Sequence, residues 1–335
     1  MTIGQAITWD ALTLDCEKAS EQIVKSIRET VGGKLKRRGL VVALSGGIDS
    51  SVVGALCVRA LGPKRVFGLQ LPERDSSSET LALSQLIVDH LGIDAESTDI
   101  TEILTAIGCY RYRDEAIRSV IPEYGPDYKC KIVLPSLLGP ESMRVFSVVV
   151  ESPDGKQSRA RLPLAAYLQI VAATNFKQRV RKTLEYFHAD RLNYAVTGTP
   201  NRQEYDQGFF VKLGDGAADI KPIAHLYKMQ VYQMAEYLGL PAAICERPPT
   251  TDTYSMPQDQ EEFYFSVSHT VLDICLYGKN HGMTPEEIAP IASLEVEQVE
   301  HVYRDIEAKR RTTRYQHMAP VLIEPVPEIQ ANDFH

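Results

Sequence analysis

One stretch near the N-terminus decides the fold: Val41-Val42-Ala43-Leu44-Ser45-Gly46-Gly47-Ile48-Asp49-Ser50-Ser51. Residues 41–44 are apolar and begin with β-branched valines, which predicts a strand buried on both faces of a parallel sheet. Gly46 and Gly47 permit a sharp turn, and Ser50 then opens a predicted helix. The N–H groups of such a turn and the N-terminus of a helix both bind anions. The stretch therefore predicts a phosphate-binding loop.

Asp49 stands inside this predicted loop. A carboxylate beside a polyphosphate is repelled unless a divalent cation lies between them, so charge alone predicts Mg²⁺ here. The stretch lacks both the Gly-Lys-Ser/Thr ending of a Walker A loop and the spacing of a dinucleotide fingerprint. It resembles the Ser-Gly-Gly-x-Asp-Ser loop of the ATP pyrophosphatase (PP-loop) superfamily, whose members hold the pyrophosphate of ATP and transfer AMP to a substrate oxygen. The alternative interpretation is a serine-rich turn that binds no ligand.

Strand and helix patterns alternate after the loop. Further strands are predicted at residues 66–71, 95–98 and 192–199, and helical spacing is present at 50–61, 81–91 and 163–189. This alternation predicts an α/β fold built on a doubly wound parallel sheet with flanking helices, with the ligand at the carboxyl ends of the strands. The superfamily resemblance implies the same architecture, that of the adenine nucleotide alpha hydrolase-like proteins.

The pattern changes between residues 108 and 162. Strand candidates lie at 131–134, 144–150 and 158–162, and Pro153-Asp154-Gly155-Lys156 is a hairpin turn signal. We expect an inserted antiparallel hairpin, a β-rich elaboration of one domain that spans residues 1–335, because no linker separates the parts. Covering the active site, forming an oligomer contact and simply elaborating the surface are all open interpretations of the insertion.

Composition excludes several classes of protein. The 335 residues carry a formal net charge of −8, which argues against an extended basic surface for nucleic acid. No window approaches the roughly 18–20 apolar residues of a membrane span, and the N-terminus has no signal-peptide pattern. The six cysteines include no C-x-x-C pair, so neither zinc nor a disulfide framework is expected. We expect a cytoplasmic protein that binds neither membrane nor nucleic acid.

Later motifs narrow the resemblance to the family of NAD synthetases. They are the runs Thr197-Gly198-Thr199-Pro200-Asn201-Arg202-Gln203-Glu204, Gly208-Phe209-Phe210-Val211-Lys212-Leu213-Gly214-Asp215-Gly216-Ala217-Ala218-Asp219, Leu226-Tyr227-Lys228 and Pro249-Thr250-Thr251-Asp252. The similarity covers residues 18–103 and 165–315. It implies a carbon–nitrogen ligase that uses ATP and Mg²⁺ to amidate nicotinic acid adenine dinucleotide (deamido-NAD) to NAD⁺ through an adenylated carboxylate, releasing AMP and pyrophosphate.

The family resemblance also implies which residues form the site. For ATP these are Ser45, Gly46, Gly47, Asp49, Ser50, Thr199, Lys228 and Thr250, of which Asp49, Lys228 and Thr250 take the catalytic roles. Asp49 and Glu204 would hold the metal. For deamido-NAD they are Asn175, Arg179, Lys212, Asp219 and Lys309. Each of three of these residues also has a purely structural interpretation. Arg179 could be a solvated helix residue, Lys212 a charged loop residue and Asp219 the cap of the helix that follows.

Some positions depart from the family pattern. Ala308-Lys309 stands where the family commonly has His-Lys. We expect Lys309 to keep its role, and the histidine's contribution is either missing or supplied from elsewhere, with His317 as a candidate. The loop at residues 200–203 differs as well. These departures and the insertion leave open an alternative, a PP-loop amide ligase that acts on a different carboxylate.

The nitrogen donor and the assembly follow from the resemblance. Glutamine-using members carry a separate amidase domain, whereas similarity to the synthetase region begins here almost at the N-terminus, so no glutaminase domain is expected. Free ammonia is the expected donor unless another subunit supplies it, and a homodimer is expected.

Other functions compete with this interpretation. PP-loop enzymes also adenylate tRNA bases, xanthine nucleotides or citrulline, although the acidic balance and the scattered cysteines argue against a tRNA substrate. Residues 283–311 have helix-turn-helix spacing, but their many glutamates would face phosphate with the wrong sign. A nucleotide sensor without turnover would require that Asp49 and Glu204 bind no metal.

Overall fold

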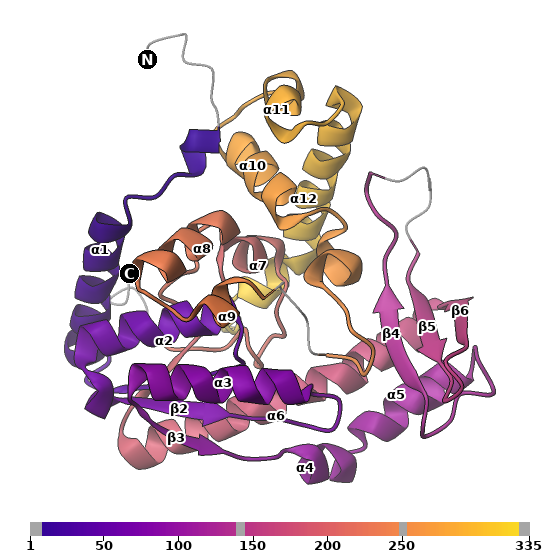
Figure 1. The fold of residues 1–335 in the computed structure, drawn as a ribbon, viewed down its shortest axis with the longest axis horizontal. Helices are drawn as coiled ribbons and strands as arrows, with labels where there is room; N and C mark the ends of the chain where they lie inside the picture. Colours follow the sequence, from indigo (N-terminus) through magenta and orange to yellow (C-terminus); the bar gives the residue numbers. More distant parts are fainter. Residues whose placement is uncertain (1–8, 139–144, 248–252, 328–335) are drawn as a thin grey trace.

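A four-stranded parallel sheet forms the centre of the fold (Figure 1). This computed structural model describes residues 9–138, 145–247 and 253–327. The strands are β1 (Leu40–Ala43), β2 (Val66–Gln70), β3 (Asp94–Ser97) and β7 (Ala195–Thr197), in the order β3-β2-β1-β7. All neighbours pair in parallel, and β1 lies in the interior of the sheet. The predicted parallel sheet is confirmed, as are its four strand positions to within a few residues.

The central strand is buried on both faces, as its sequence predicts. Leu40 and Val42 belong to one core cluster, and Val41 belongs to a second cluster on the opposite face. All three side chains are 0% exposed. Because helices cover both faces, the ends of the strands are the part of the sheet that remains for a ligand.

Helices flank the sheet on each side. The first cluster packs α1 (Cys16–Arg28), α2 (Ile48–Leu61), α3 (Ser78–Leu91), α8 (Lys228–Tyr237) and α9 (Ala242–Cys245) against it, and the second packs α4 (Thr101–Ala106), α5 (Cys109–Arg118) and α6 (Leu164–Leu192). Short helical turns η1 (Trp9–Leu12), η2 (Glu29–Lys34) and η3 (Pro63–Arg65) accompany them, as does α7 (Arg202–Gln207) after β7. In the described part of the chain, no helix combines the length and the apolar character that a membrane crossing needs.

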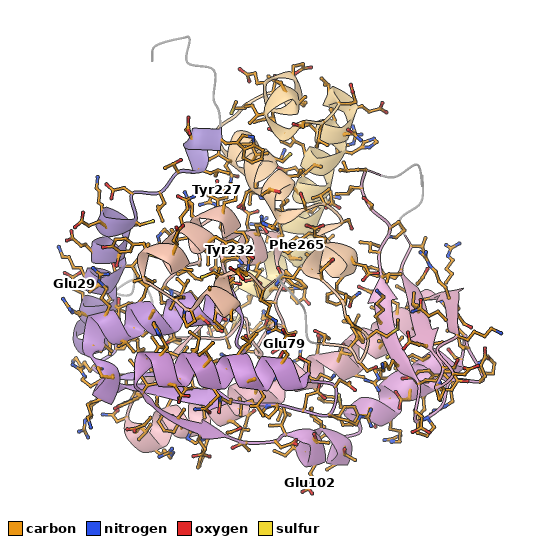
Figure 2. The ribbon with its side chains drawn as sticks, viewed as in Figure 1. Glu29, Glu79, Glu102, Tyr227, Tyr232 and Phe265 are labelled. Atoms are coloured by element: carbon orange, nitrogen blue, oxygen red, sulfur yellow. The ribbon has the colours of Figure 1, made fainter. Side chains whose placement is uncertain are left out.

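The C-terminal helices form a separate layer with its own core. The turn η4 (Glu261–Phe265) leads into α10 (His269–Asn280), α11 (Pro285–Ala292) and α12 (Val296–His317). Leu272, Ile288 and Val302 are buried between these helices. Figure 2 shows Phe265, which is buried, inside the molecule, whereas Glu29 and Glu102 lie at its edges. The helix-turn-helix spacing therefore corresponds to α11 and α12 packed onto α10.

The insertion is a small three-stranded antiparallel sheet preceded by a helix. Its strands are β4 (Lys129–Val133), β5 (Ser147–Glu151) and β6 (Gln157–Arg161), in that spatial order. The hairpin turn is confirmed, since the N–H of Gly155 donates to the carbonyl of Ser152 at 2.8 Å. The sequence analysis did not identify helix α5, which opens this region and packs against α6.

We predict that Gly46→Ala destabilises the protein by about 2–5 kcal/mol. Gly46 has φ +70, and an added Cβ would lie 2.8 Å from Leu83 Cβ and from Ser84 N. The left-handed backbone contributes ~1–2 kcal/mol and overpacking about 1–3 kcal/mol. The measurement is the free energy of unfolding in urea. Gly92→Ala is the control, because Gly92 has φ +61 and open space around it; equal losses in both variants would contradict the close packing of the loop on α3.

Candidate active site

The predicted phosphate loop connects β1 to α2 in the expected geometry. The Ser45 and Ser50 hydroxyl oxygens lie 3.3 Å apart, and the N–H of Gly47 donates to Ser45 Oγ at 3.3 Å. Gly47 is the N-cap of α2, and its carbonyl accepts from the Ser51 hydroxyl at 2.8 Å. The helix N-terminus and the serine hydroxyls therefore face the same point, which suits an anion.

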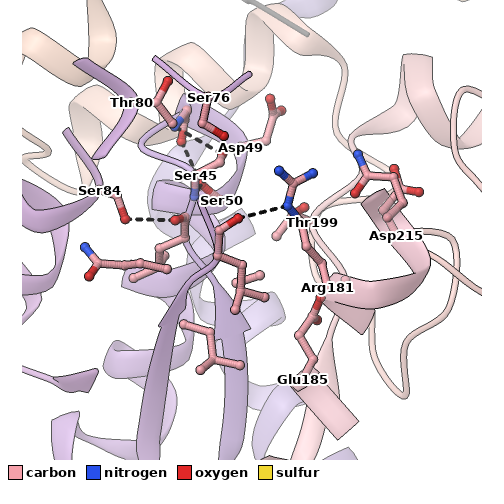
Figure 3. Close-up of a pocket in the computed structure, with 18 of the residues that line it drawn as sticks. Ser45, Asp49, Ser50, Ser76, Thr80, Ser84, Arg181, Glu185, Thr199 and Asp215 are labelled. Atoms are coloured by element: carbon pink, nitrogen blue, oxygen red, sulfur yellow. Dashed lines mark hydrogen bonds between the residues drawn. The ribbon is translucent and has the colours of Figure 1, made fainter. Parts of the chain in front are cut away.

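A cavity of about 260 Å³ opens in front of this loop (Figure 3). The ends of three strands line it, together with residues of α3, α6 and the segments after β7. The lining residues include Ser45, Gly47, Asp49, Ser50, Gln70, Leu71, Thr80, Arg181, Lys182, Glu185, Thr199, Asp215, Glu204, Lys228 and Gln260. Ligand binding at the carboxyl ends of the strands, which the topology predicts, has a matching cavity.

Asp49 and Glu204 converge through a shared neighbour, Asn201. The Asn201 side-chain amide donates to Asp49 Oδ1 at 2.9 Å, and the Asn201 backbone N–H donates to Glu204 Oε2 at 3.0 Å. Lys228 forms an ion pair with the other oxygen of Asp49. Gln260 Nε2 donates to Glu204 Oε1 at 3.1 Å. Two carboxylates that are 155 positions apart in the sequence, those of Asp49 and Glu204, thus border one cavity beside the buried ammonium group of Lys228.

The ionisable side chains of Glu204 and Lys228 are buried and lie close to other charges, and both effects shift their pKa values. Burial and the charge of Asp49 together raise the pKa of Glu204 to about 8, although Lys228 lowers it. Burial opposes the charge of Lys228, but Asp49 and Glu204 outweigh it and raise the pKa of this lysine. A divalent cation between the two carboxylates would relieve their repulsion.

The donor set fits Mg²⁺. Asp49 and Glu204 would supply oxygen ligands, and in the described ranges no group of three or more His, Cys, Asp and Glu side chains could hold a metal ion. Mg²⁺ is bound in nucleotide enzymes by one or two carboxylates, with phosphates and water completing the shell. Two carboxylates beside an anion-binding loop are therefore a sufficient protein contribution.

Asp273 is a positioning residue that sequence analysis missed. It is 0% exposed on α10, and its Oδ1 accepts from Gln203 Nε2 at 2.7 Å and from the N–H of Lys228 at 3.2 Å. Its Oδ2 accepts from the N–H of Met229 at 2.8 Å. Burial raises the pKa of Asp273 to about 7. One carboxylate therefore fixes both the start of α8 and the helix that carries Glu204.

Helix α6 supplies a second wall that sequence analysis also missed. Arg181 Nε donates to the Leu71 carbonyl at 3.1 Å, and Lys182 pairs with Glu185 at 2.6 Å. Burial raises the pKa of Glu185 despite Lys182, and burial also raises the pKa of Asp215. The i, i+3 and i+4 spacing of these α6 residues was a signal available in the sequence.

The residues predicted to bind deamido-NAD, unlike most of those predicted to bind ATP, do not line the cavity. Arg179 and Lys212 come together, since Arg179 Nε donates to the Lys212 carbonyl at 3.3 Å. Asn175 lies one turn before Arg179 on α6. Asp219 accepts the backbone N–H of Val196 at 2.7 Å. These four residues lie outside the lining of the cavity.

The remaining predicted site residues lie either near the C-terminus or outside the residues that the structure describes. Lys309 forms an ion pair with Asp305 at 2.7 Å and donates to the Tyr264 carbonyl at 3.0 Å, again outside the cavity lining. The His317 ring packs edge-on against Tyr205. Thr250, with the motif at residues 249–252, lies outside the described residues.

Comparisons with known proteins show which proteins this chain is similar to. The family model described as NAD synthase matches residues 19–120 and 152–314. The chain is 54% identical to an NH(3)-dependent NAD(+) synthetase of Mesorhizobium japonicum, over 95% of this chain and 99% of that protein. It is also 54% identical to one of Rhizobium meliloti, over 96% of each.

Solved structures share the fold at low identity. An NH3-dependent NAD synthetase from Campylobacter jejuni superposes with TM-score 0.61 at 22% identity, covering 93% of this chain and 100% of that chain. An NMN synthetase from Francisella tularensis superposes with TM-score 0.59 at 20% identity, covering 92% and 99%.

We predict that Glu204→Gln stabilises the metal-free protein at alkaline pH. The folded pKa of about 8 lies above the ordinary value of 4.5, so folding favours the protonated carboxyl, and stability falls as the pH rises toward 8. A neutral amide avoids this loss, by about 1–3 kcal/mol at pH 9. The measurement is the unfolding free energy with EDTA at pH 5 and pH 9. A gain that is equal at both pH values would contradict the pKa shift.

Proposed function

Because this chain belongs to the NAD synthase family, we propose that it amidates deamido-NAD with ammonia, using ATP and releasing AMP and pyrophosphate. The observation that carries the proposal is the convergence of Asp49, Glu204 and Lys228 beside the loop at residues 45–50. An enzyme that expels pyrophosphate needs cations and N–H donors at such a point.

The proposed reaction has two steps that balance. A carboxylate oxygen of deamido-NAD attacks the α-phosphorus of ATP, the bond to pyrophosphate breaks, and a carboxyl-adenylate forms. Ammonia then attacks the carboxyl carbon, the bond to AMP breaks, and one proton leaves the nitrogen. Direct amidation is unfavourable because a carboxylate lacks a good leaving group, so ATP is required.

The residues of the cavity have distinct proposed roles. The loop with Ser45, Gly46, Gly47 and Ser50 would hold the phosphates through N–H and hydroxyl donors, while Thr199 would donate from the end of β7. Lys228 would neutralise the charge that develops on the leaving pyrophosphate. Mg²⁺, when held by Asp49 and Glu204, would supply further charge neutralisation.

The dinucleotide would bind beyond the cavity. Asn175, Arg179 and Lys212 form a polar group that suits a pyrophosphate-bridged substrate, and Arg179 and Lys212 provide its cations. Asp219 and Lys309 are proposed to contribute through their family positions, and Thr250 is proposed for the ATP phosphates. The alternative substrate remains another carboxylate, because residues 200–203 and Ala308 depart from the family pattern.

The cysteines bear on the compartment in which the proposed reaction takes place. All six cysteines are free, which suits a reducing compartment, and we place the enzyme in the cytoplasm.

Two cations of the cluster at residues 309–311 already have internal partners, since Lys309 pairs with Asp305 and Arg310 with Asp206. This leaves little basis for the DNA-binding alternative.

A homodimer is proposed on the exposed face of α6. Leu164 is 71% exposed and Leu168 is 53% exposed, and the same helix face continues through Asn175 and Arg179. An apolar patch that runs into two proposed substrate residues suits a second copy of this chain, with the dinucleotide between the copies.

We predict that ATP, Mg²⁺ and ammonium yield equimolar AMP, pyrophosphate and NAD⁺ only when deamido-NAD is the carboxylate. Asp49→Asn should lower kcat/KM by about 10²–10³-fold, because it removes a proposed ligand of the Mg²⁺ that would neutralise the leaving pyrophosphate. Asp89→Asn, an exposed change on α3, is the control. Faster turnover of nicotinic acid mononucleotide would contradict the substrate, and equal rates with pure glutamine would contradict the donor.

We predict that Leu168→Glu converts a dimer to a monomer in sedimentation equilibrium, since a buried interfacial charge is unfavourable. Ile103→Glu is the control, because Ile103 is 41% exposed on α4, away from the proposed interface. The proposal fails if the unaltered protein sediments as a monomer, or if both variants remain dimers.

A further inference from the structure

Glu204 is held from two directions. One oxygen accepts the N–H of Asn201 at 3.0 Å, which belongs to the same helical turn. The other oxygen accepts Gln260 Nε2 at 3.1 Å. Gln260 is half-buried, lines the cavity, and lies 56 positions further along the chain. The orientation of Glu204 therefore depends on a segment that is remote in sequence.

The segment that carries Gln260 runs along strand β4 of the insertion. The N–H of Cys130 donates to Ser255 Oγ at 2.9 Å, and the N–H of Met256 donates back to the Cys130 carbonyl at 3.2 Å. The Gln258 side-chain amide donates to the Ile132 carbonyl. Contact to β4 is thus continuous up to two residues before Gln260.

The contacts resume directly after Gln260. The N–H of Leu134 donates to the Glu262 carbonyl at 3.1 Å, and Lys131 forms an ion pair with the Glu262 side chain at 2.7 Å. Further on, the N–H of Leu137 donates to the Ser266 carbonyl at 3.1 Å. Residue numbers increase together along both segments, so they lie side by side in the same direction, and Gln260 is fixed from both sides.

Strand β4 is an addition to the family pattern. The family model matches residues 19–120 and 152–314 and leaves residues 121–151 unmatched, which include all of β4. The inserted sheet therefore contributes contacts to the cavity wall that the matched regions do not contain.

We propose that Gln260 is a positioning residue for Glu204, and that the inserted strand β4 holds Gln260 in place. This inference rests on the proposed function, because it requires Glu204 to bind the metal of a metal–ATP complex. A carboxylate whose two oxygens are both oriented meets the narrow octahedral geometry of Mg²⁺ without further ordering.

The test measures binding instead of turnover. Gln260→Met keeps the length of the side chain and removes the donor. Its affinity for the Mn²⁺ complex of α,β-methylene-ATP, followed by electron paramagnetic resonance and calorimetry, should fall by about 10-fold. Affinity for the same nucleotide in EDTA should stay unchanged, and this split separates positioning of a metal ligand from a general disturbance of the fold.

Matched variants complete the design. Gln157→Met alters an exposed amide of the inserted sheet that contacts Glu151, and should bind like the unaltered protein. Gln258→Met breaks one contact to β4 and should weaken metal-dependent binding in the same direction, but less than Gln260→Met. Thermal unfolding shows that each variant is folded at the assay temperature.

The possible results separate the positioning role of Gln260 from the metal-binding role of Glu204. If Glu204→Gln weakens binding of the metal complex but Gln260→Met does not, the positioning role is wrong and the proposed metal site stands. Equal loss with and without metal in Gln260→Met also overturns the positioning role. If Gln258→Met matches Gln157→Met, the role of β4 is wrong. If Glu204→Gln binds the metal complex normally, the metal role of Glu204 fails, and this inference fails with it.

Discussion

The site depends on one buried ion pair, that of Lys228 with Asp49. Lys228 is 1% exposed, and the desolvation of its ammonium group is offset chiefly by its ion pair with Asp49. Removing one partner of a buried pair leaves an uncompensated charge, which is strongly destabilising. The loop after β1, the turn after β7 and the start of α8 must therefore meet at one point for the fold to be stable. The same convergence produces the proposed anion and metal site, so stability and proposed chemistry share the same contacts.

Helix capping accomplishes much of this convergence. Asn201 caps α7 through its side-chain oxygen, which accepts the N–H of Glu204 at 3.2 Å, while its amide nitrogen donates to Asp49. Glu204 returns a bond to the Asn201 N–H as the third residue of the capping box. Asp273 performs the corresponding task at the start of α8. The local rules that begin helices thus orient the side chains of the cavity, and Glu204, the proposed metal ligand, is also part of a helix cap.

The sequence could predict the parts of this arrangement that depend on local pattern. Valines at 41 and 42, paired glycines and a following helix are sufficient for the strand, the turn and the anion-binding end, and the family motifs place Asp49, Glu204 and Lys228 in one site. Contacts between distant segments have no such local signal. Asp273 and Gln260 act through bonds to residues 45 and 56 positions away, and their partners become visible only when helices and strands are packed. Arg181, Lys182 and Glu185 show a helical spacing, but whether that face meets a cavity or a core is decided by packing alone.

The segment after residue 252, which carries Gln260, is held in place by contacts from other elements. Between α9 and η4 the described chain has no regular helix or strand of its own, so its position depends on other elements. Its beginning is anchored by Lys177, which is 1% exposed and donates to the Thr253 carbonyl at 2.8 Å while it pairs with Glu73 and Asp75. Arg113 of α5 pairs with the same Asp75 at 2.6 Å. A buried cluster of this kind is favourable only when every member is present, so it fixes the start of the segment firmly, and β4 fixes the remainder. The first anchor therefore comes from Lys177 of α6, in a cluster that Arg113 of α5 completes, and the second comes from the inserted strand β4, which runs beside Gln260. Together they order a wall of the cavity that has no regular helix or strand of its own.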